Sequence, residues 1–262
     1  MTRIFDALRK IQAARPLEAP PPPHPVDPGP AYPTTPAMHP GRSYTPGRPA
    51  APPATILALP VATDLEDDVL REMSTLRMTL EATLGERTPR VLTFASSQAG
   101  EGTTTIVTQF ARVLAREEGL RVLLVDFNAR RPRLDAGFAG DAATHAPTDP
   151  RMPHGQLALL PLDARYEAAG MVPPPEARAL IESASAAYDW VLIDGPPILD
   201  APDAATLAAL SDGVVLVVQA GRTKKPVLAR SADLLRKAGA RVLGTVLNRR
   251  RMEIPDFIYR RI

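Results

Sequence analysis

The alternation of short apolar runs with helix-like segments after residue 61 constrains the fold of this 262-residue chain more than any other feature. The apolar runs are rich in Val, Ile and Leu, which is typical of parallel strands covered by helices on both faces. We therefore predict the α/β class, with a doubly wound, mostly parallel sheet and helices on both faces. The expected strands are 90–95, 121–126, 189–194, 213–219 and 241–247. The expected helices are 64–84, 103–118, 175–187, 202–210 and 224–238, and 135–160 is expected to be a loop.

Proline separates this region from the first sixty residues. Sixteen of the 30 prolines lie between Pro16 and Pro60. Proline lacks a backbone donor and fixes φ, so such a stretch cannot build a strand ladder and is expected to be extended. We predict a disordered, Pro-rich linker over 15–60, followed by one α/β domain over 61–262.

The segment before the linker, residues 1–14, places Ile4, Phe5, Leu8 and Ile11 on one helical face. It is predicted to be a short amphipathic helix, which is marginally stable alone in water. Two roles stay open for it. It packs on its own domain, or it docks on a partner or a membrane surface at the end of the tether.

The composition excludes several classes of protein. The chain has no cysteine, so neither a disulfide framework nor a cysteine metal site is available. No apolar run approaches the ~18 residues of a membrane span, and the N-terminus has no signal-peptide core. The net charge of +2 is too small to indicate nucleic-acid binding by itself. We expect a soluble, cytoplasmic protein that binds no nucleic acid.

The residues SSQAGEGTTT at 96–105 connect an expected strand to the helix that follows it. Gly100 and Gly102 allow backbone N–H groups to approach an anion closely, and the start of the helix adds partial positive charge. Thr104 stands where the motif G-x-x-x-x-G-K-[ST] places a Mg²⁺-binding hydroxyl. The strict motif is not met, because its first glycine is Ser97 and its lysine is Thr103. The pattern predicts a phosphate-binding loop without its lysine.

Aspartates end two further strands, at Asp126 and Asp194. A carboxylate at the end of an apolar strand is costly unless it is solvated, paired or near a metal. Two of them meeting a glycine loop at the carboxyl edge of a sheet favour a Mg²⁺–nucleotide site. The alternative is that each aspartate caps the turn after it. Asn248, at the end of the last strand, is a candidate to pair with a purine edge.

Five blocks of the sequence together resemble the bacterial tyrosine kinases of capsule and exopolysaccharide synthesis, which belong to the MinD/ParA-like P-loop ATPases. The blocks are FASSQAGEGTTT, LLVDFNARRPRL, YDWVLIDGPP, SDGVVLVVQAGRT and AGARVLGTVLNR, in order over roughly residues 65–250. The opening MTRIFDALRK is also similar to the N-termini of some members. The resemblance implies a P-loop NTPase fold with ATP or ADP and Mg²⁺ as cofactors.

The resemblance also implies roles for individual residues. It makes Gly100–Thr104 the Walker A loop, Asp126 the Walker A′ aspartate, Asp194 the Walker B aspartate and Asn248 an adenine contact. The implied nucleotide-binding residues are Gly100, Glu101, Gly102, Thr103, Thr104, Thr105 and Asn248. The implied metal ligands are Thr104, Asp126 and Asp194, and the two aspartates are also the catalytic candidates if the protein is active.

Members of this family work beside a chain-length-determinant protein of the inner membrane and phosphorylate tyrosines in their own C-terminal tails. The resemblance therefore implies that partner, a cytoplasmic location peripheral to the inner membrane, and a homo- or hetero-oligomer with related kinases. Tyr259 is the candidate for autophosphorylation, and it stands alone in IPDFIYRRI where members carry a tyrosine cluster.

The sequence departs from the family pattern at other functional positions as well. Thr103 replaces the lysine whose charge lies on the phosphates, and Asn128 replaces an acid two residues after Asp126. In the helix before the loop, the family's oligomerisation pattern is Glu, Arg, Arg. Aligned on that pattern, the chain has Arg71, Ser74 and Arg77, with Glu72 as a displaced acid.

Because these departures are independent and the fold-bearing residues still match, we predict a catalytically impaired homologue, a pseudokinase that regulates polysaccharide export. One alternative is an active autokinase that recruits another cation, for which Arg130 and Arg131 are candidates. Another is a ParA/MinD-type positioning ATPase, although that group carries an additional lysine where this chain has Gln98.

Overall fold

The computed structural model describes residues 57–59, 65–86, 88–117, 119–134 and 156–249, all of which belong to one compact unit. The N-terminal helix predicted at 1–14, most of the Pro-rich linker and Tyr259 lie outside the described residues. The assignment of these segments stays a prediction.

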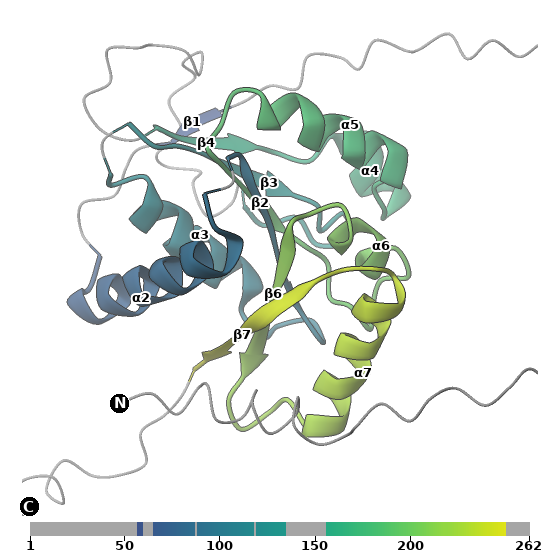
Figure 1. Cartoon of the computed structure of the whole chain (residues 1–262). Coiled ribbons are helices and arrows are strands. Elements are labelled where there is room, and N and C mark those ends of the chain that lie inside the picture. The colour runs from purple at the N-terminus through teal and green to yellow at the C-terminus, as the bar shows by residue number, and fades with distance from the viewer. Residues whose placement is uncertain (1–56, 60–64, 87, 118, 135–155, 250–262) are drawn as a thin grey trace, which may run out of the picture. The chain divides into compact units, whose positions relative to one another are not determined.

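The described part is built on a seven-stranded sheet with the order β1-β4-β3-β5-β2-β6-β7 (Figure 1). Strands β2 to β7 are all parallel to one another, and β1 pairs antiparallel with β4 at one edge. The strands are β1 Leu57–Leu59, β2 Arg90–Ser96, β3 Arg121–Asp126, β4 Gln156–Leu160, β5 Trp190–Asp194, β6 Gly213–Gln219 and β7 Val242–Asn248. The predicted doubly wound, mostly parallel sheet is confirmed.

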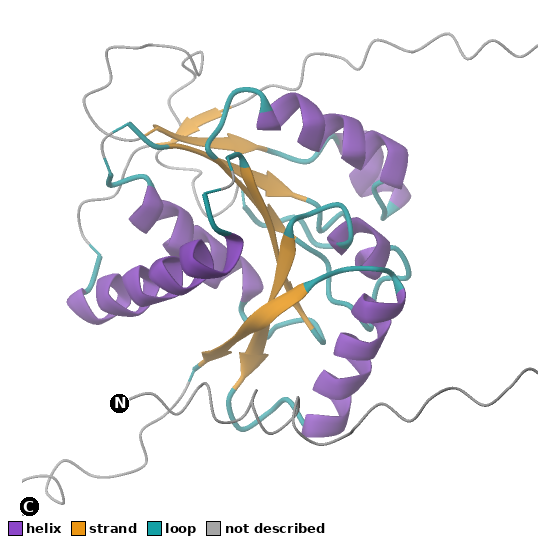
Figure 2. Cartoon of the chain, viewed as in Figure 1, coloured by secondary structure: helices purple, strands orange, loops and turns teal. Residues whose placement is uncertain are grey.

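Helices cover both faces of the sheet, as Figure 2 shows. The helices α2 and α3 lie on one face, and α4 to α7 lie on the other (Figures 1 and 2). Their bounds are α2 Asp67–Leu84, α3 Thr103–Leu114, α4 Ala164–Ala169, α5 Pro174–Ser185, α6 Ala204–Ala208 and α7 Lys225–Lys237. The short helix α4 was not predicted.

Two parts of the sequence prediction need correction. The segment 135–160 was expected to be a loop, but β4 occupies its last five residues and pairs with β3. The range 15–60 was expected to be linker, but Leu57–Leu59 forms β1 against β4. Both strands are short apolar runs next to proline-rich sequence, and their pairing partners lie far away in the chain, so local pattern did not reveal them.

The helix–sheet packing explains the apolar character of the strands. All five residues of β5 are buried, because this strand lies at the centre of the sheet under helices on both faces. On the face of α2 and α3, Phe110 lies between Phe94 and Trp190, with ring centroids 5.6 and 5.9 Å away. This packing holds the second half of α3 against the middle of β2 and the start of β5, and the other end of the helix begins at the candidate site.

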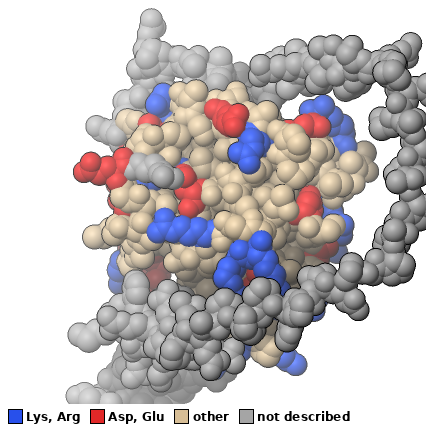
Figure 3. Space-filling model, turned by 45° about the vertical axis from the view of Figure 1, so that its right-hand side comes forward, with Lys and Arg blue, Asp and Glu red and all other residues tan. Residues whose placement is uncertain are grey.

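The described residues contain no helix long and apolar enough to cross a membrane. On the face of the described part drawn in Figure 3, Lys and Arg side chains stand among Asp and Glu. The expectation that the protein binds no nucleic acid stays a prediction.

Candidate functional site

The glycine loop connects β2 to α3 at the carboxyl edge of the sheet. Gly100 and Gly102 have φ values of +87° and +96°, which favour glycine. Gly102 is the N-cap of α3 and has no side chain to offer, so the first N–H groups of this twelve-residue helix receive no side-chain cap. The first N–H groups and the positive end of the helix dipole point to the same place, as in an anion-binding loop.

Glu101 shapes the loop from inside. Its side chain is buried, and its Oε2 accepts hydrogen bonds from the backbone N–H groups of Ser97, at 2.8 Å, and Gln98, at 3.3 Å. Its Oε1 accepts a hydrogen bond from the Thr223 hydroxyl, in the turn after β6. The carboxylate therefore ties the beginning of the glycine loop to a second loop of the same edge.

Asn248, at the end of β7, contacts the same loop. Its Nδ2 donates to the carbonyl oxygen of Glu101 at 2.9 Å, and its Oδ1 accepts from the Arg249 N–H at 2.8 Å. A Cβ built on Gly102 would stand closer to Asn248 Nδ2 than the 3.0 Å that real Cβ atoms respect. Gly102 is thus needed for its φ and also for the close approach of the Asn248 amide.

The predicted aspartates meet beside the start of α3. Asp126 and Asp194 are register partners on the adjacent strands β3 and β5, and both side chains are buried. Thr104, in the first turn of α3, donates its hydroxyl to Asp194 Oδ2 at 2.6 Å. Burial, reinforced by the charge of Asp126, raises the pKa of Asp194 to about 8.

The two aspartates are bound differently. Asp126 Oδ1 accepts from the N–H of Asn128 at 2.8 Å, and its Oδ2 accepts from the N–H groups of Arg133 and Leu134 at 3.1 and 3.3 Å. This carboxylate therefore orders the segment after β3. Within the described part of the chain, Asp194 Oδ1 is buried without a hydrogen-bond partner. An orphaned carboxylate oxygen beside a threonine hydroxyl is a donor set suited to Mg²⁺, which binds few protein ligands and keeps waters and phosphate oxygens.

No group of three or more His, Cys, Asp or Glu side chains gathers in the described residues as a metal cage. Thr104 and Asp194 fit the metal role. Asp126 lies next to them but directs both oxygens to backbone donors.

Comparison with known proteins gives a consistent picture. No family model matches the chain. A tyrosine-protein kinase of Streptococcus agalactiae, CpsD, is 29% identical over 173 residues, covering 61% of this chain and 75% of the relative. YwqD of Bacillus subtilis, also named a tyrosine-protein kinase, is 28% identical over 190 residues, covering 68% of this chain and 80% of YwqD. This chain is a homologue of bacterial tyrosine-protein kinases.

Solved structures with the same fold extend the likeness beyond these sequences. The kinase domain of the Escherichia coli tyrosine kinase ETK superposes with a TM-score of 0.53 at 20% identity, over 71% of this chain and 79% of that one. The VpsO kinase domain superposes with a TM-score of 0.52 at 25% identity, over 71% of this chain and 98% of the VpsO chain. The predicted P-loop NTPase fold is confirmed by these matches.

At the position of the missing lysine, the kinase homologue has a buried Thr103 at the start of α3. Thr105, also predicted to bind nucleotide, is exposed one position beyond Thr104. The proposed replacement cations after β3 are both exposed. Arg130 donates to the carbonyl oxygen of Asp200 at 2.9 Å, so its guanidinium already has a partner.

Three residues at this edge were missed by sequence reasoning. Thr223 and Arg222, in the turn after β6, contact Glu101 and approach Gly100, respectively. Asp200, after β5, accepts from the Ala99 N–H at 2.9 Å. Arg222 and Thr223 lie in SDGVVLVVQAGRT, one of the blocks that carry the resemblance, and Asp200 follows the block YDWVLIDGPP by three residues, but no local signal shows that these residues reach the glycine loop.

In the helix before the loop, Arg77 pairs within the chain. It donates to Glu81 on α2 at 2.9 Å and forms an ion pair with Glu117 after the end of α3. Arg71 pairs with Asp68 at the exposed start of α2. The described contacts of these arginines are therefore internal ones, and the predicted oligomer stays a prediction.

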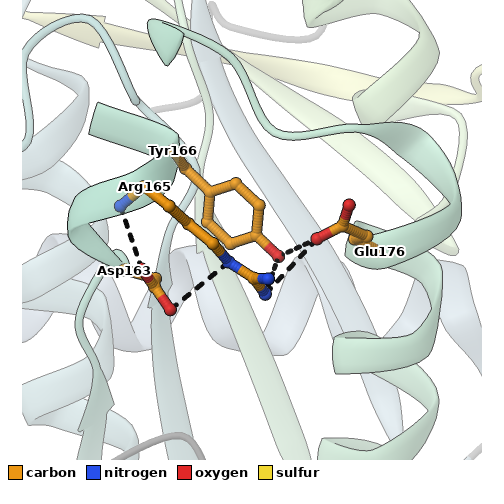
Figure 4. A network of polar contacts seen from close by, with 4 residues as sticks. All are labelled: Asp163, Arg165, Tyr166 and Glu176. Atoms are coloured by element: carbon orange, nitrogen blue, oxygen red, sulfur yellow. Dashed lines mark hydrogen bonds and ion pairs between the residues drawn. The ribbon is translucent and has the colours of Figure 1, made fainter. Parts of the chain in front are cut away.

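A second polar cluster lies outside the loop edge, between α4 and α5 (Figure 4). The Tyr166 hydroxyl donates to Glu176 and accepts from Arg165 at 2.6 Å, while Asp163 caps α4 through the Arg165 N–H at 2.9 Å. Burial, reinforced by the hydrogen bond to Glu176, raises the pKa of Tyr166 to about 12. These contacts join the two helices.

Proposed function

We propose that this kinase homologue binds ATP or ADP with Mg²⁺ at the glycine loop, and that its phosphoryl transfer is impaired. The observation that carries the proposal is Asp194 Oδ1, a buried carboxylate oxygen without a partner among the described residues, beside the Thr104 hydroxyl at the start of α3. Leaving such a group orphaned is expensive unless a ligand completes it.

The residues divide the work of binding among them. Backbone N–H groups of the loop and the start of α3 receive the phosphates. Thr104 and Asp194 would hold a Mg²⁺ ion, which would offset the charge of the phosphates. Glu101 holds the loop open from inside through Ser97 and Gln98, and so pre-organises it. When bound, the metal–nucleotide complex supplies the phosphoryl group, and Mg²⁺ offsets the charge that builds up on its oxygens.

The impairment follows from the residue that replaces the lysine. Phosphoryl transfer depends on positioning and on charge stabilisation. Thr103 has no charge, and a loss of ~4 kcal/mol of transition-state stabilisation lowers the rate about a thousandfold. Binding suffers less, because the backbone donors and Mg²⁺ do not depend on residue 103.

The relatives suggest where the protein acts. The succinoglycan biosynthesis transport protein ExoP of Rhizobium meliloti is 32% identical over 181 residues, covering 61% of this chain and 22% of that protein. By analogy we assign this chain to the synthesis and export of a capsule or exopolysaccharide. Its partner is a chain-length-determinant protein of the inner membrane, to which it is held peripherally from the cytoplasm.

If tyrosine phosphorylation occurs, Tyr259 is the proposed acceptor. Tyr166 and Tyr188 are each only 5% exposed and cannot reach an active site without unfolding. A phosphate found on either of them in the folded protein would contradict this assignment.

Calorimetric titration of the purified protein with ATP and with ADP, each with and without Mg²⁺, tests the site. We expect binding in the micromolar range that weakens on removal of Mg²⁺ and in Asp194→Ala. The matched control is Asp212→Ala at the opposite end of the sheet, where the carboxylate accepts from the Val91 N–H. No binding at millimolar nucleotide would refute the proposal, and the function of the protein would then depend on contacts made by its surface.

The partner assignment has its own test. Co-purification with the chain-length-determinant protein, reconstituted in detergent, is expected to retain the kinase homologue. Complete absence of retention, with the protein shown to be folded by circular dichroism, would refute the assignment without affecting the nucleotide site.

A further inference from the structure

We propose that Arg222, in the turn between β6 and α7, supplies positive charge that strengthens the binding of nucleotide phosphates at the phosphate-binding loop. The inference rests on the proposed nucleotide site and assigns a further binding residue to it. The site itself is marked by two independent features, the uncapped start of α3 and the orphaned Asp194 Oδ1.

Arg222 lies against the glycine loop. A Cβ built on Gly100 would come within 3.3 Å of Arg222 Nη1, which is closer than nine in ten real Cβ contacts. The guanidinium therefore packs on the bare backbone of Gly100, two residues before the N-cap of α3. The absence of a side chain at Gly100 gives the guanidinium room at the loop.

The turn that carries Arg222 is fastened to the same loop. The neighbouring Thr223 donates its hydroxyl to Glu101 and accepts from the Gln219 N–H at 3.2 Å. The Ala220 N–H donates to the carbonyl oxygen of Asn248 at 2.9 Å. The backbone that carries Arg222 is therefore held in place relative to the loop before any ligand binds. Less conformational entropy is then lost when the side chain binds a phosphate.

The charge of Arg222 is available. The residue is exposed, and its one side-chain hydrogen bond among the described residues runs from Nη1 to the neutral amide Oε1 of Gln219, at 3.3 Å. The ion pairs of the described residues do not include it. A guanidinium presents several donors in a planar fork that suits phosphate oxygens. A long arginine from a neighbouring turn can thus strengthen phosphate binding from outside α3, while the charge that a lysine at position 103 would place within α3 for phosphoryl transfer is still missing.

Other cations of the described chain fit less well. Arg130 is bound to the carbonyl oxygen of Asp200, and the Asp200 carboxylate lies on the Ala99 N–H of the loop. An acid between Arg130 and the phosphates would offset part of its charge. Lys224 and Lys225 begin α7, and no contact places them on the glycine loop.

The test compares Mg²⁺–ATP affinity of the full-length chain with that of Arg222→Gln, Arg222→Lys and Arg130→Gln. The matched control is Arg230→Gln, an exposed arginine on α7. We expect Arg222→Gln to weaken binding about tenfold, which corresponds to about 1.4 kcal/mol. Arg222→Lys should recover most of the affinity, and Arg230→Gln and Arg130→Gln should stay within about twofold.

Repeating the Arg222→Gln substitution in the Thr103→Lys variant tests whether the effect of Arg222 comes from its charge. In the Thr103→Lys variant, the introduced lysine contacts the phosphates itself. Adding Arg222→Gln to this variant should therefore lower the Mg²⁺–ATP affinity less than threefold. The difference between the two backgrounds is a coupling that a purely structural role would not produce. Thermal melting followed by circular dichroism checks that each variant is folded.

The outcomes separate this inference from the proposed function. If the unaltered protein binds no nucleotide, both are wrong. If it binds and Arg222→Gln binds equally well, only the assignment of Arg222 is overturned. If only Arg130→Gln lowers the Mg²⁺–ATP affinity, the assignment of Arg222 is also overturned. The phosphate-binding cation would then be Arg130, in the segment after β3.

Discussion

Asn248 Nδ2 occupies the space that a Cβ on Gly102 would need, so a strand end and a helix N-cap approach each other closely at the site. Gly102→Ala is therefore expected to remove nucleotide binding and to destabilise the fold by about 2–4 kcal/mol, from the positive φ and the collision together. Gly239→Ala is the matched control, since its φ is +82° and its Cβ would meet nothing within 4 Å.

The control should show only the φ cost of about 1–2 kcal/mol. Adding Asn248→Ala to Gly102→Ala should recover part of the lost stability, because it empties the space. Equal denaturation midpoints for Gly102→Ala and Gly239→Ala would show that the Asn248 contact has no energetic weight.

Thr103→Lys is expected to raise Mg²⁺–ATP affinity and to raise any autophosphorylation rate at least tenfold, because it returns a positive charge to the start of α3. Thr103→Gln is the control for added length without charge. The measurement is transfer of radiolabelled phosphate to the protein, with Asp194→Ala in the Thr103→Lys background as the inactive reference. A rate unchanged by the lysine would place the impairment elsewhere, for instance at Asn128.

Glu101→Ala is expected to lower the free energy of unfolding by about 1–3 kcal/mol, because it leaves the buried N–H of Ser97 and the partly buried N–H of Gln98 without their acceptor. It should also loosen the turn at Thr223 and weaken nucleotide binding. Urea denaturation measures the first effect and calorimetry the second. Glu182→Ala, at an exposed position of α5, is the control and should change little. An unchanged urea midpoint for Glu101→Ala would contradict the bracing role of this carboxylate.

The stability of the nucleotide-free protein should depend on pH through Asp194. Its pKa is raised from the model-compound value of 3.8 to about 8 in the folded protein. Between these values the unfolded chain has lost a proton that the folded chain retains, so stability falls as the pH rises, by at most about 1.4 kcal/mol per pH unit. Above pH 8 the loss levels off.

Asp194→Asn does not titrate, so its melting temperature relative to the unaltered protein should rise from pH 4 to pH 8 and then become constant. Titrating groups that do not interact with Asp194 cancel in this difference. A difference independent of pH across this window would mean that Asp194 is ionised in the folded protein.

The alternation of Val/Ile/Leu runs and helix-like segments was sufficient to predict the parallel sheet, the two helical layers and the edge at which the site lies. The reason is local: hydrophobic periodicity and strand-terminal polar residues are properties of neighbouring positions. Placing Asp126, Asp194 and the glycine loop at one edge needed only the rule that parallel strands end together, and the register of Asp126 with Asp194 agrees with it.

Tertiary structure alone decided which polar groups touch. Arg222 packs on Gly100 and Glu101 accepts from Thr223, and both contacts join segments distant in the chain. The hydrogen bonds from Ser97 to Glu101 and from Asn128 to Asp126 are close in sequence, yet no local pattern shows that these carboxylates turn to the backbone while Asp194 Oδ1 has no partner among the described residues. The strands β1 and β4 were likewise decided by tertiary structure. A short apolar run becomes a strand only when the edge of a neighbouring strand is available for its hydrogen bonds. Sequence pattern records what each segment prefers, and the three-dimensional packing determines which of these preferences meet.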